Sequence, residues 1–136
     1  MTLPEIAAAL RAELEKHFQT VRLTAIQTAE QFAYEVKAIH PDKLPGVLII
    51  FDRMSDNSDT GVRDFYFTVV LLDRFRASSD IRASSVFQAG AALLELFPAE
   101  GRELGGCWVH PVDCVTASPD KDFAALALGL ECRTSF

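Results

Sequence analysis

Three side chains in the C-terminal part of the chain could bind a metal ion or form a nucleophilic pair: Cys107, His110 and Cys114. Structural zinc sites use four tetrahedral ligands, and catalytic zinc sites use three protein ligands with one open position. In an extended strand His110 and Cys114 would share one face, and Cys107 would point to the other. A fourth ligand would have to come from elsewhere in the fold, and a cysteine nucleophile would need an orienting residue that the sequence does not show. We therefore expect ordinary strand residues here, with no catalytic residue, metal or cofactor; a small metal- or thiol-dependent enzyme is the alternative.

A second polar group, the segment Asp52–Asp64, holds four aspartates between two apolar runs. Part of it, Asp56–Gly61, is similar to the start of a calcium-binding loop. With Asp56 as the first ligand, however, the final position, where calcium needs a bidentate glutamate, falls on Phe67. A calcium site is therefore not expected. A polar loop between two strong strands is instead a natural place to contact a partner.

The composition is that of one globular domain, residues 1–136, with 49% hydrophobic and 24% charged residues. A net charge of −6 and the lack of a basic cluster argue against a nucleic-acid partner. No apolar run approaches the ~20 residues that a membrane span needs, and the N-terminus lacks the pattern of a signal peptide. The three cysteines, an odd number, favour reduced thiols in a cytoplasm over a disulfide framework.

Two apolar runs, Val47–Phe51 and Phe65–Leu72, dominate the middle of the chain. Both are rich in β-branched and aromatic residues, which favours strands. In the second run both alternating faces are largely apolar, so we expect a central strand with something packed on each side. The intervening segment Arg53–Asp64 is predicted to be a long loop.

Helices and further strands are expected on either side of this pair. In order, the pattern predicts a helix over Leu3–Gln19, a short strand over Val21–Ile26, a helix over Thr28–Ala38, the two central strands, a helix over Asp80–Leu96, and strands over Cys107–Thr116 and Phe123–Thr134. Gly90 would allow the last helix to approach the sheet closely. Pro111 cannot donate a ladder hydrogen bond, so its strand should lie at an edge or contain a bulge. Two hairpins with helices on one face give an α+β, two-layer domain: a mainly antiparallel sheet of about four strands with two or three helices packed on it.

Several segments, taken in order, carry a likeness to a known family. They are the amphipathic helix Leu3–Phe18, the run Leu44–Phe51, the run Phe65–Arg74, the helix end Leu93–Phe97 and the closing strand Leu126–Cys132. In pattern and order, over most of the chain, they resemble the small tail terminator proteins of tailed phages, particularly the Mu-like family.

The resemblance implies a non-enzymatic structural protein of a phage or prophage virion. Such proteins form rings, commonly of six copies, on the end of the tail tube; they stop its polymerisation and offer a surface for joining the head. The implied partners are further copies of the chain and the tail tube protein, in the host cytoplasm during assembly and in the virion tail afterwards. We expect the contacts in the loop Arg53–Asp64 and the strand near Trp108–Val112. The residues chosen are Arg53, Asp56, Asp59, Arg63, Trp108 and His110. A monomeric adaptor that binds one protein partner is a further alternative.

Overall fold

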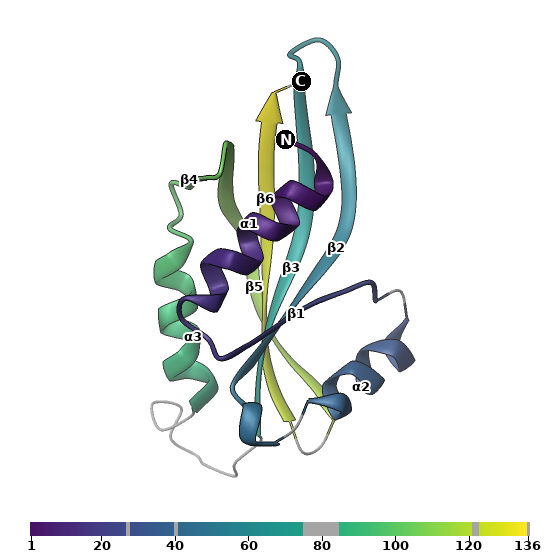
Figure 1. Ribbon diagram of the computed structural model, residues 1–136, viewed down its shortest axis with the longest axis vertical. Helices are drawn as coiled ribbons and strands as arrows, with labels where there is room; N and C mark the ends of the chain where they lie inside the picture. The colour runs from purple at the N-terminus through teal and green to yellow at the C-terminus, as the bar shows by residue number, and fades with distance from the viewer. Residues whose placement is uncertain (27, 40, 75–84, 121–122, 136) are drawn as a thin grey trace.

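The computed structural model of the chain describes residues 1–26, 28–39, 41–74, 85–120 and 123–135. Within these ranges the α+β class expected from the sequence is confirmed (Figure 1). The elements are α1 (Leu3–Glu15), β1 (Thr20–Thr24), α2 (Ala29–Ala38), the 3₁₀-helix η1 (Pro41–Lys43), β2 (Gly46–Asn57), β3 (Val62–Arg74), α3 (Ser85–Leu96), β4 (Arg102–Leu104), β5 (Cys107–Asp120) and β6 (Phe123–Ser135). No helix of the described ranges is long and apolar enough to cross a membrane.

The six strands of the described ranges form one curled sheet in the order β1-β2-β3-β6-β5-β4. Neighbouring strands are antiparallel, except that β1 is parallel to β2. The sheet is mainly antiparallel, as predicted, but it has six strands in the described ranges and not about four. β1 lies where a short strand was expected over Val21–Ile26, which the predicted sheet did not include, and β4, with 3 residues, is too short for a clear period in the sequence. β1 is parallel because α2 provides the crossover that a parallel pair requires.

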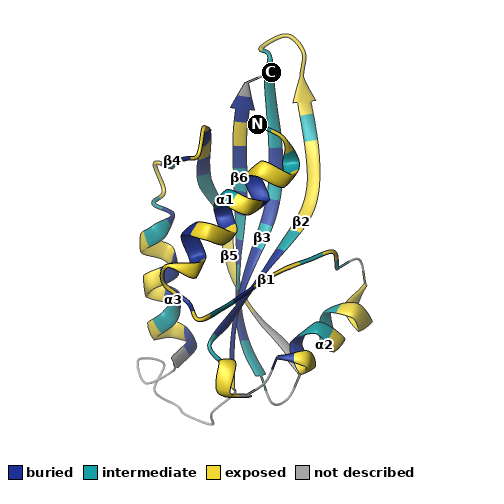
Figure 2. Ribbon diagram, viewed as in Figure 1, coloured by how far each residue is buried: buried dark blue, intermediate teal, exposed yellow. Residues whose placement is uncertain are grey.

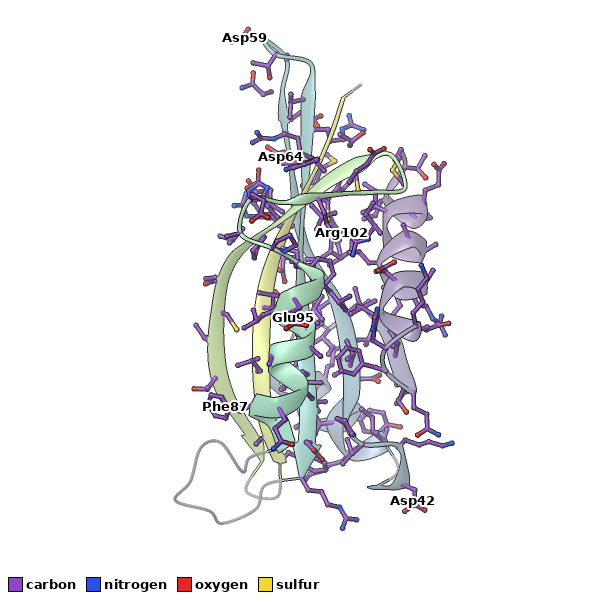
Figure 3. All side chains as sticks on the ribbon, turned by 90° about the vertical axis from the view of Figure 1, so that its left-hand side faces the viewer. Asp42, Asp59, Asp64, Phe87, Glu95 and Arg102 are labelled. Atoms are coloured by element: carbon purple, nitrogen blue, oxygen red, sulfur yellow. The ribbon has the colours of Figure 1, made fainter. Side chains whose placement is uncertain are left out.

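The segment Arg53–Asp64 is a β-hairpin and not the predicted long loop. β2 continues to Asn57 and β3 begins at Val62. The side chain of Asn57 accepts hydrogen bonds from two backbone N–H groups of the turn, at 3.1 and 3.3 Å. Gly61 closes the turn with φ of 68°, a conformation that glycine adopts without steric cost. The hairpin projects beyond the other strands (Figures 1 and 3); we call this end of the sheet the tip and the opposite end the base.

One face of the sheet is covered by α1 and α3, which enclose the main hydrophobic core (Figure 2). Ile6, Leu10 and Leu14 are fully buried against it, which confirms the predicted apolar stripe. Thr2 caps α1 as expected, since its hydroxyl accepts a hydrogen bond from the backbone N–H of Glu5 at 3.4 Å. The helix ends earlier than the sequence pattern predicted. The apolar stripe of α1 thus covers this face of the sheet.

α3 begins at Ser85 in the described chain and ends at Leu96, as predicted; residues 80–84 of the predicted helix lie outside the described residues. A Cβ atom added at Gly90 would lie 2.7 Å from Cδ2 of Leu126 on β6. The close approach expected at this glycine is therefore confirmed. It allows α3 to press directly on the sheet.

The opposite face of the sheet, which we call the outer face, is covered by α2 only near the base. Val36 and Ile39 pack there against Leu48, Val70 and Leu72. The helix predicted in this region is confirmed, and so is the prediction that the central strand β3 is packed on both sides. The prediction of helices on one face only is wrong, because the β1–α2–β2 crossover carries α2 to the other side. Toward the tip, no helix of the described residues covers the outer face (Figure 2).

β5 contains a bulge beside its proline. Pro111 is opposite Leu130 and Asp113 is opposite Gly129, so Val112 is the extra residue. Past Val109, no described strand pairs with the free edge of β5. The prediction of an edge position or a bulge is therefore confirmed in both respects. The bulge also shifts the side chains from Asp113 to Thr116 to the face opposite to regular alternation.

Candidate interaction surface

A row of polar side chains crosses the uncovered part of the outer face. Arg53, Tyr66, Glu131 and His110 are successive cross-strand neighbours on β2, β3, β6 and β5. The Arg53 guanidinium lies 3.8 Å from the centroid of the Tyr66 ring, a cation–π contact. At the other end of the row, Nε2 of His110 lies 3.4 Å from a carboxylate oxygen of Glu131. Two residues chosen from the sequence, Arg53 and His110, are thus placed on one face, at opposite edges of the sheet.

A second row lies closer to the tip and is joined to the first by Arg133. Arg133 donates hydrogen bonds to Asp64 and to Glu131, each at 3.0 Å. The hydrogen bond with Asp64, reinforced by its charge, raises the pKa of the Arg133 guanidinium, which therefore stays charged. Trp108 is the neighbour of Arg133 on β5 and is 47% exposed. Its indole lies over Gly101, where a Cβ atom would overlap the ring. The two rows make a mixed polar and aromatic surface, in the centre of which Arg133 bridges the carboxylates of Asp64 and Glu131.

The remaining residues chosen from the sequence lie on the hairpin. Arg63 and Asp56 form a bidentate pair across it, with Nε–Oδ1 at 2.6 Å and Nη2–Oδ2 at 3.0 Å. Asp59 lies in the turn and points away from the body of the protein (Figure 3). Asp52 instead accepts a hydrogen bond of 2.6 Å from the Thr68 hydroxyl. Asp52 and Asp56 thus each bond to a different side chain of the sheet.

The structure separates the three residues of the candidate metal site. Cys107 is buried on the face covered by α1 and α3, whereas His110 lies on the outer face. The prediction that His110 and Cys114 share a face is wrong, because the bulge returns Cys114 to the face of Cys107. Among the described residues no group of three or more His, Cys, Asp or Glu side chains could hold a metal ion. The sequence spacing that suggested zinc is therefore not matched by the geometry.

Cys107 instead lies beside Cys132 of β6, the remaining cysteine of the chain. Both side chains are buried, and the Cys107 thiol donates to the Leu104 carbonyl at 3.2 Å. The hydrogen bond with Cys107, together with burial, raises the pKa of the Cys132 thiol far above its usual range. Cys132 is therefore a neutral core side chain at ordinary pH.

The short strands leave two sheet edges unpaired: the edge of β5 was predicted from Pro111, whereas the edge of β2 was not. β1 pairs with β2 only as far as Ile50, and β4 pairs with β5 only as far as Val109. In the described chain, no strand pairs with this side of β2 or with this side of β5 beyond those points. The large apolar side chains exposed along the first edge are Leu23, Phe51 and Met54, and those along the second are Trp108, Val112 and Val115. Met54 is the single apolar residue of β2 after Phe51, so the local pattern did not indicate that the strand continues.

The surface beside the edge of β2 is hollowed. Two shallow hollows of about 480 and 490 Å³ adjoin each other there and share Leu3 and Phe51 in their walls. Met54 and Phe65 line the one nearer the tip, and Leu23 lines the other. The free backbone of β2 thus borders an apolar recess between the start of α1 and the hairpin.

Compared with known proteins, the chain matches no protein-family model, and no curated protein is significantly similar to it. The outer face, the hairpin and the two sheet edges are therefore the features of the molecule that bear on its function. The resemblance to tail terminators, which depends on the order of segments in the sequence, stays a prediction.

Proposed function

We propose that this chain is a structural assembly protein of a phage or prophage tail, of the tail terminator class. In this role, copies of the chain form a ring. In the family that the chain resembles, the ring commonly contains six copies. The ring sits on the end of the tail tube, stops the addition of tube subunits and offers a surface to the head. The proposal combines the order of sequence segments with one structural observation: two different unpaired edges lie on opposite sides of one sheet.

That observation supports a ring because ring closure needs heterologous contacts. In such contacts, one surface of a copy meets a different surface of the next, and rotation brings the last copy back to the first. The edge of β2 and the edge of β5 are two such surfaces within one chain. Both carry exposed apolar side chains beside free backbone groups, which are features of surfaces that pair with another chain.

The hairpin supports a second contact, with the tube or with a neighbouring copy. It extends past the helices, so its turn reaches surfaces that the compact body cannot. Asp56, Asp59 and Arg63 place charges of both signs there. Trp108 and His110 lie on the outer face, which faces away from α1 and α3 and is open toward the tip. These placements agree with partner contacts at the residues chosen from the sequence.

The proposal is tested by adding the purified chain to the tail tube protein of the same genome while the tubes polymerise. We expect shorter tubes with a ring at one end in negative-stain electron micrographs. The double variant Arg53→Glu/Arg63→Glu should lose this effect, and it should remain folded by circular dichroism. Lys43→Glu/Lys37→Glu is the matched control, since both lysines are exposed at the base and the change in net charge is equal. Tubes of unchanged length with the wild-type chain would overturn the proposal.

Two further observations separate the alternatives. Elemental analysis that finds stoichiometric zinc, lost in Cys107→Ser/Cys114→Ser, would favour the metal-dependent enzyme. Binding of one protein partner by a chain that stays monomeric on it would favour the adaptor. Flanking genes for sheath, tube and tape-measure proteins would support the tail class directly.

A further inference from the structure

We propose that copies of this chain join by strand pairing, with the free segment of β2, Phe51–Ser55, in one copy antiparallel to the free segment of β5, His110–Cys114, in the next, and with Arg53 facing Asp113. The ring itself rests on the proposed function above. The contact is a property of the two edges and can be tested separately.

The extent of the pairing follows from the strands that already occupy the edges. β1 occupies the edge of β2 up to Ile50, and β4 occupies the edge of β5 up to Val109. Beyond these points each strand presents unpaired N–H and C=O groups. Such groups form a template to which an extended segment of another chain adds by main-chain hydrogen bonds. The contact is therefore restricted to the stretches immediately past β1 and β4.

The direction follows from the order of the sheet. β2 is antiparallel to β3, β3 to β6, and β6 to β5, so β2 and β5 run in opposite directions. When a second copy continues the sheet in the same orientation, its β2 lies antiparallel beside β5 of the first copy. Antiparallel pairing is the slightly more stable of the two ladders per residue.

The register follows from charge and from the sheet faces. Arg53 is opposite Tyr66 and Asp113 is opposite Gly129, so both charged side chains lie on the outer face. Both residues are exposed and, among the described residues, neither has an oppositely charged partner. Since one lies at each edge, copies placed edge to edge bring the two charges together.

The remaining pairs of this register also agree in face. Each of the two paired segments contains one bulge residue, Asp52 on β2 and Val112 on β5. When the bulges are skipped, Ser55 meets His110 on the outer face. On the other face, Met54 meets Pro111 and Phe51 meets Cys114. No pair in the register sets an outer-face side chain against one from the helix-covered face, which a slip of one residue would do.

The exposed apolar side chains explain the attraction beyond the backbone hydrogen bonds. Phe51 and Met54 are 37% and 45% exposed and line the hollow of about 490 Å³ beside Leu3. Val112, at the bulge of β5, is 59% exposed and lies within the segment that meets this hollow. Burial of these groups removes apolar surface from water on both sides of the contact. Because the two surfaces differ, every copy can use both at once, and the copies join head to tail.

A charge-swap experiment tests the facing pair. Arg53→Asp and Asp113→Arg are each expected to lose assembly, measured by multi-angle light scattering in solution and as rings on tube ends. An equimolar mixture of the two variants should regain assembly. The altered β2 edge of Arg53→Asp then meets the altered β5 edge of Asp113→Arg, and the two unaltered edges meet each other. The product should contain the variants in alternation, which native mass spectrometry detects. Lys43→Asp controls for the change in net charge of Arg53→Asp, and thermal melting followed by circular dichroism checks that each variant is folded.

A cross-linking experiment tests the register independently. Phe51→Cys places a thiol opposite the native Cys114 of the next copy, too far from Cys114 of its own copy to react. Oxidised glutathione should join the two thiols in a disulfide, taking two electrons and releasing two molecules of reduced glutathione. We expect a ladder of covalent oligomers on a non-reducing gel, lost in Phe51→Cys/Cys114→Ser. Peptide mass spectrometry should identify the 51–114 linkage.

The outcomes distinguish this contact from the proposed function. Rings that still form in both Arg53→Asp and Asp113→Arg would overturn the pairing and leave the terminator proposal standing. A ladder of Phe51→Cys linked 51–51 or 114–114 would do the same. Open fibres linked 51–114 that never shorten tail tubes would support the pairing and overturn the terminator proposal. A wild-type chain that stays monomeric at high concentration and on tube ends would overturn both.

Discussion

Glu13 of α1 accepts a hydrogen bond from Arg102 of β4, with 3.1 Å between Oε1 and Nη1, although 89 positions separate the two residues in the chain. The same guanidinium nitrogen donates to the carbonyl of Leu96, the last residue of α3, at 3.2 Å. Lys16 approaches the other carboxylate oxygen at 3.1 Å. Glu13 is only 9% exposed, so this charged group joins both helices of the covered face to β4 from within the protein.

The stability of the fold should therefore depend on the charge of Glu13. The hydrogen bond from Lys16, with a further one from Arg102, lowers the pKa of Glu13 below its ordinary value of 4.5, although burial acts in the opposite direction. Stability from this site is present above pH 4.5 and is lost as the pH falls through the lower pKa of the folded state. We expect Glu13→Gln to lower the free energy of unfolding by about 1–2 kcal/mol at neutral pH. The difference from wild type should shrink in acid. Urea unfolding across pH checks this, with the exposed Glu15→Gln as control.

The parts of the fold that were predictable from the sequence are those whose pattern is local. The stripe that contains Ile6 and Leu10 has helical spacing, and the run Phe65–Leu72 is apolar on both faces, so each element follows from its own residues. Gly90 was also interpreted correctly, because a glycine within a helix has few roles other than close approach.

The errors concern features that depend on distant partners. β2 and β3 continue through polar residues because the strands pair with each other, for instance at Asp56 and Arg63, and not because the residues are apolar. The bulge at Val112 reverses the faces of the residues after it, and its position is set by pairing with β6. The candidate interaction surface was thus found in part: the edge position of the strand that holds Trp108 and His110 was predicted, and the free edge of β2 was not.

The contact between Gly101 and Trp108 should make Gly101→Ala strongly destabilising. Gly101 has φ of 88°, and a Cβ atom there would overlap the indole ring. Gly61 has φ of 68° but no atom within 4 Å of the added Cβ position. We expect Gly61→Ala to cost about 1–2 kcal/mol from backbone strain alone and Gly101→Ala to cost clearly more. Chemical unfolding measures both. Since the chain has one tryptophan, its emission spectrum should shift in Gly101→Ala only; equal costs with no spectral change would contradict the contact.

The ion pair Asp56–Arg63 could stabilise the hairpin, contact a partner, or do both, and a charge exchange separates the two roles. The swapped variant Asp56→Arg/Arg63→Asp keeps an ion pair across the hairpin and exchanges the two charges. Its melting temperature should equal that of wild type, whereas the ability to shorten tail tubes should fall if the tip contacts the tube or a neighbouring copy. Arg63→Asp alone serves as the comparison that lacks the pair. Full activity of the swapped variant together with loss of activity in Arg63→Asp would assign the pair to hairpin structure alone.

The three cysteines should differ sharply in their reaction with a disulfide reagent, because only Cys114 is exposed, whereas Cys107 and Cys132 are buried. Burial, and then the neighbouring charge of Asp113, raises the pKa of Cys114 above its ordinary value of 9.0. Because the thiolate is the reacting form, labelling of the folded chain should be slow near neutral pH and should accelerate as the pH rises above 9.0. We expect one fast-reacting thiol in the folded chain, none in Cys114→Ser, and all three in urea. Asp113→Asn should raise the labelling rate at pH 8 by lowering the pKa, and an unchanged rate would show that this carboxylate does not act on the thiol.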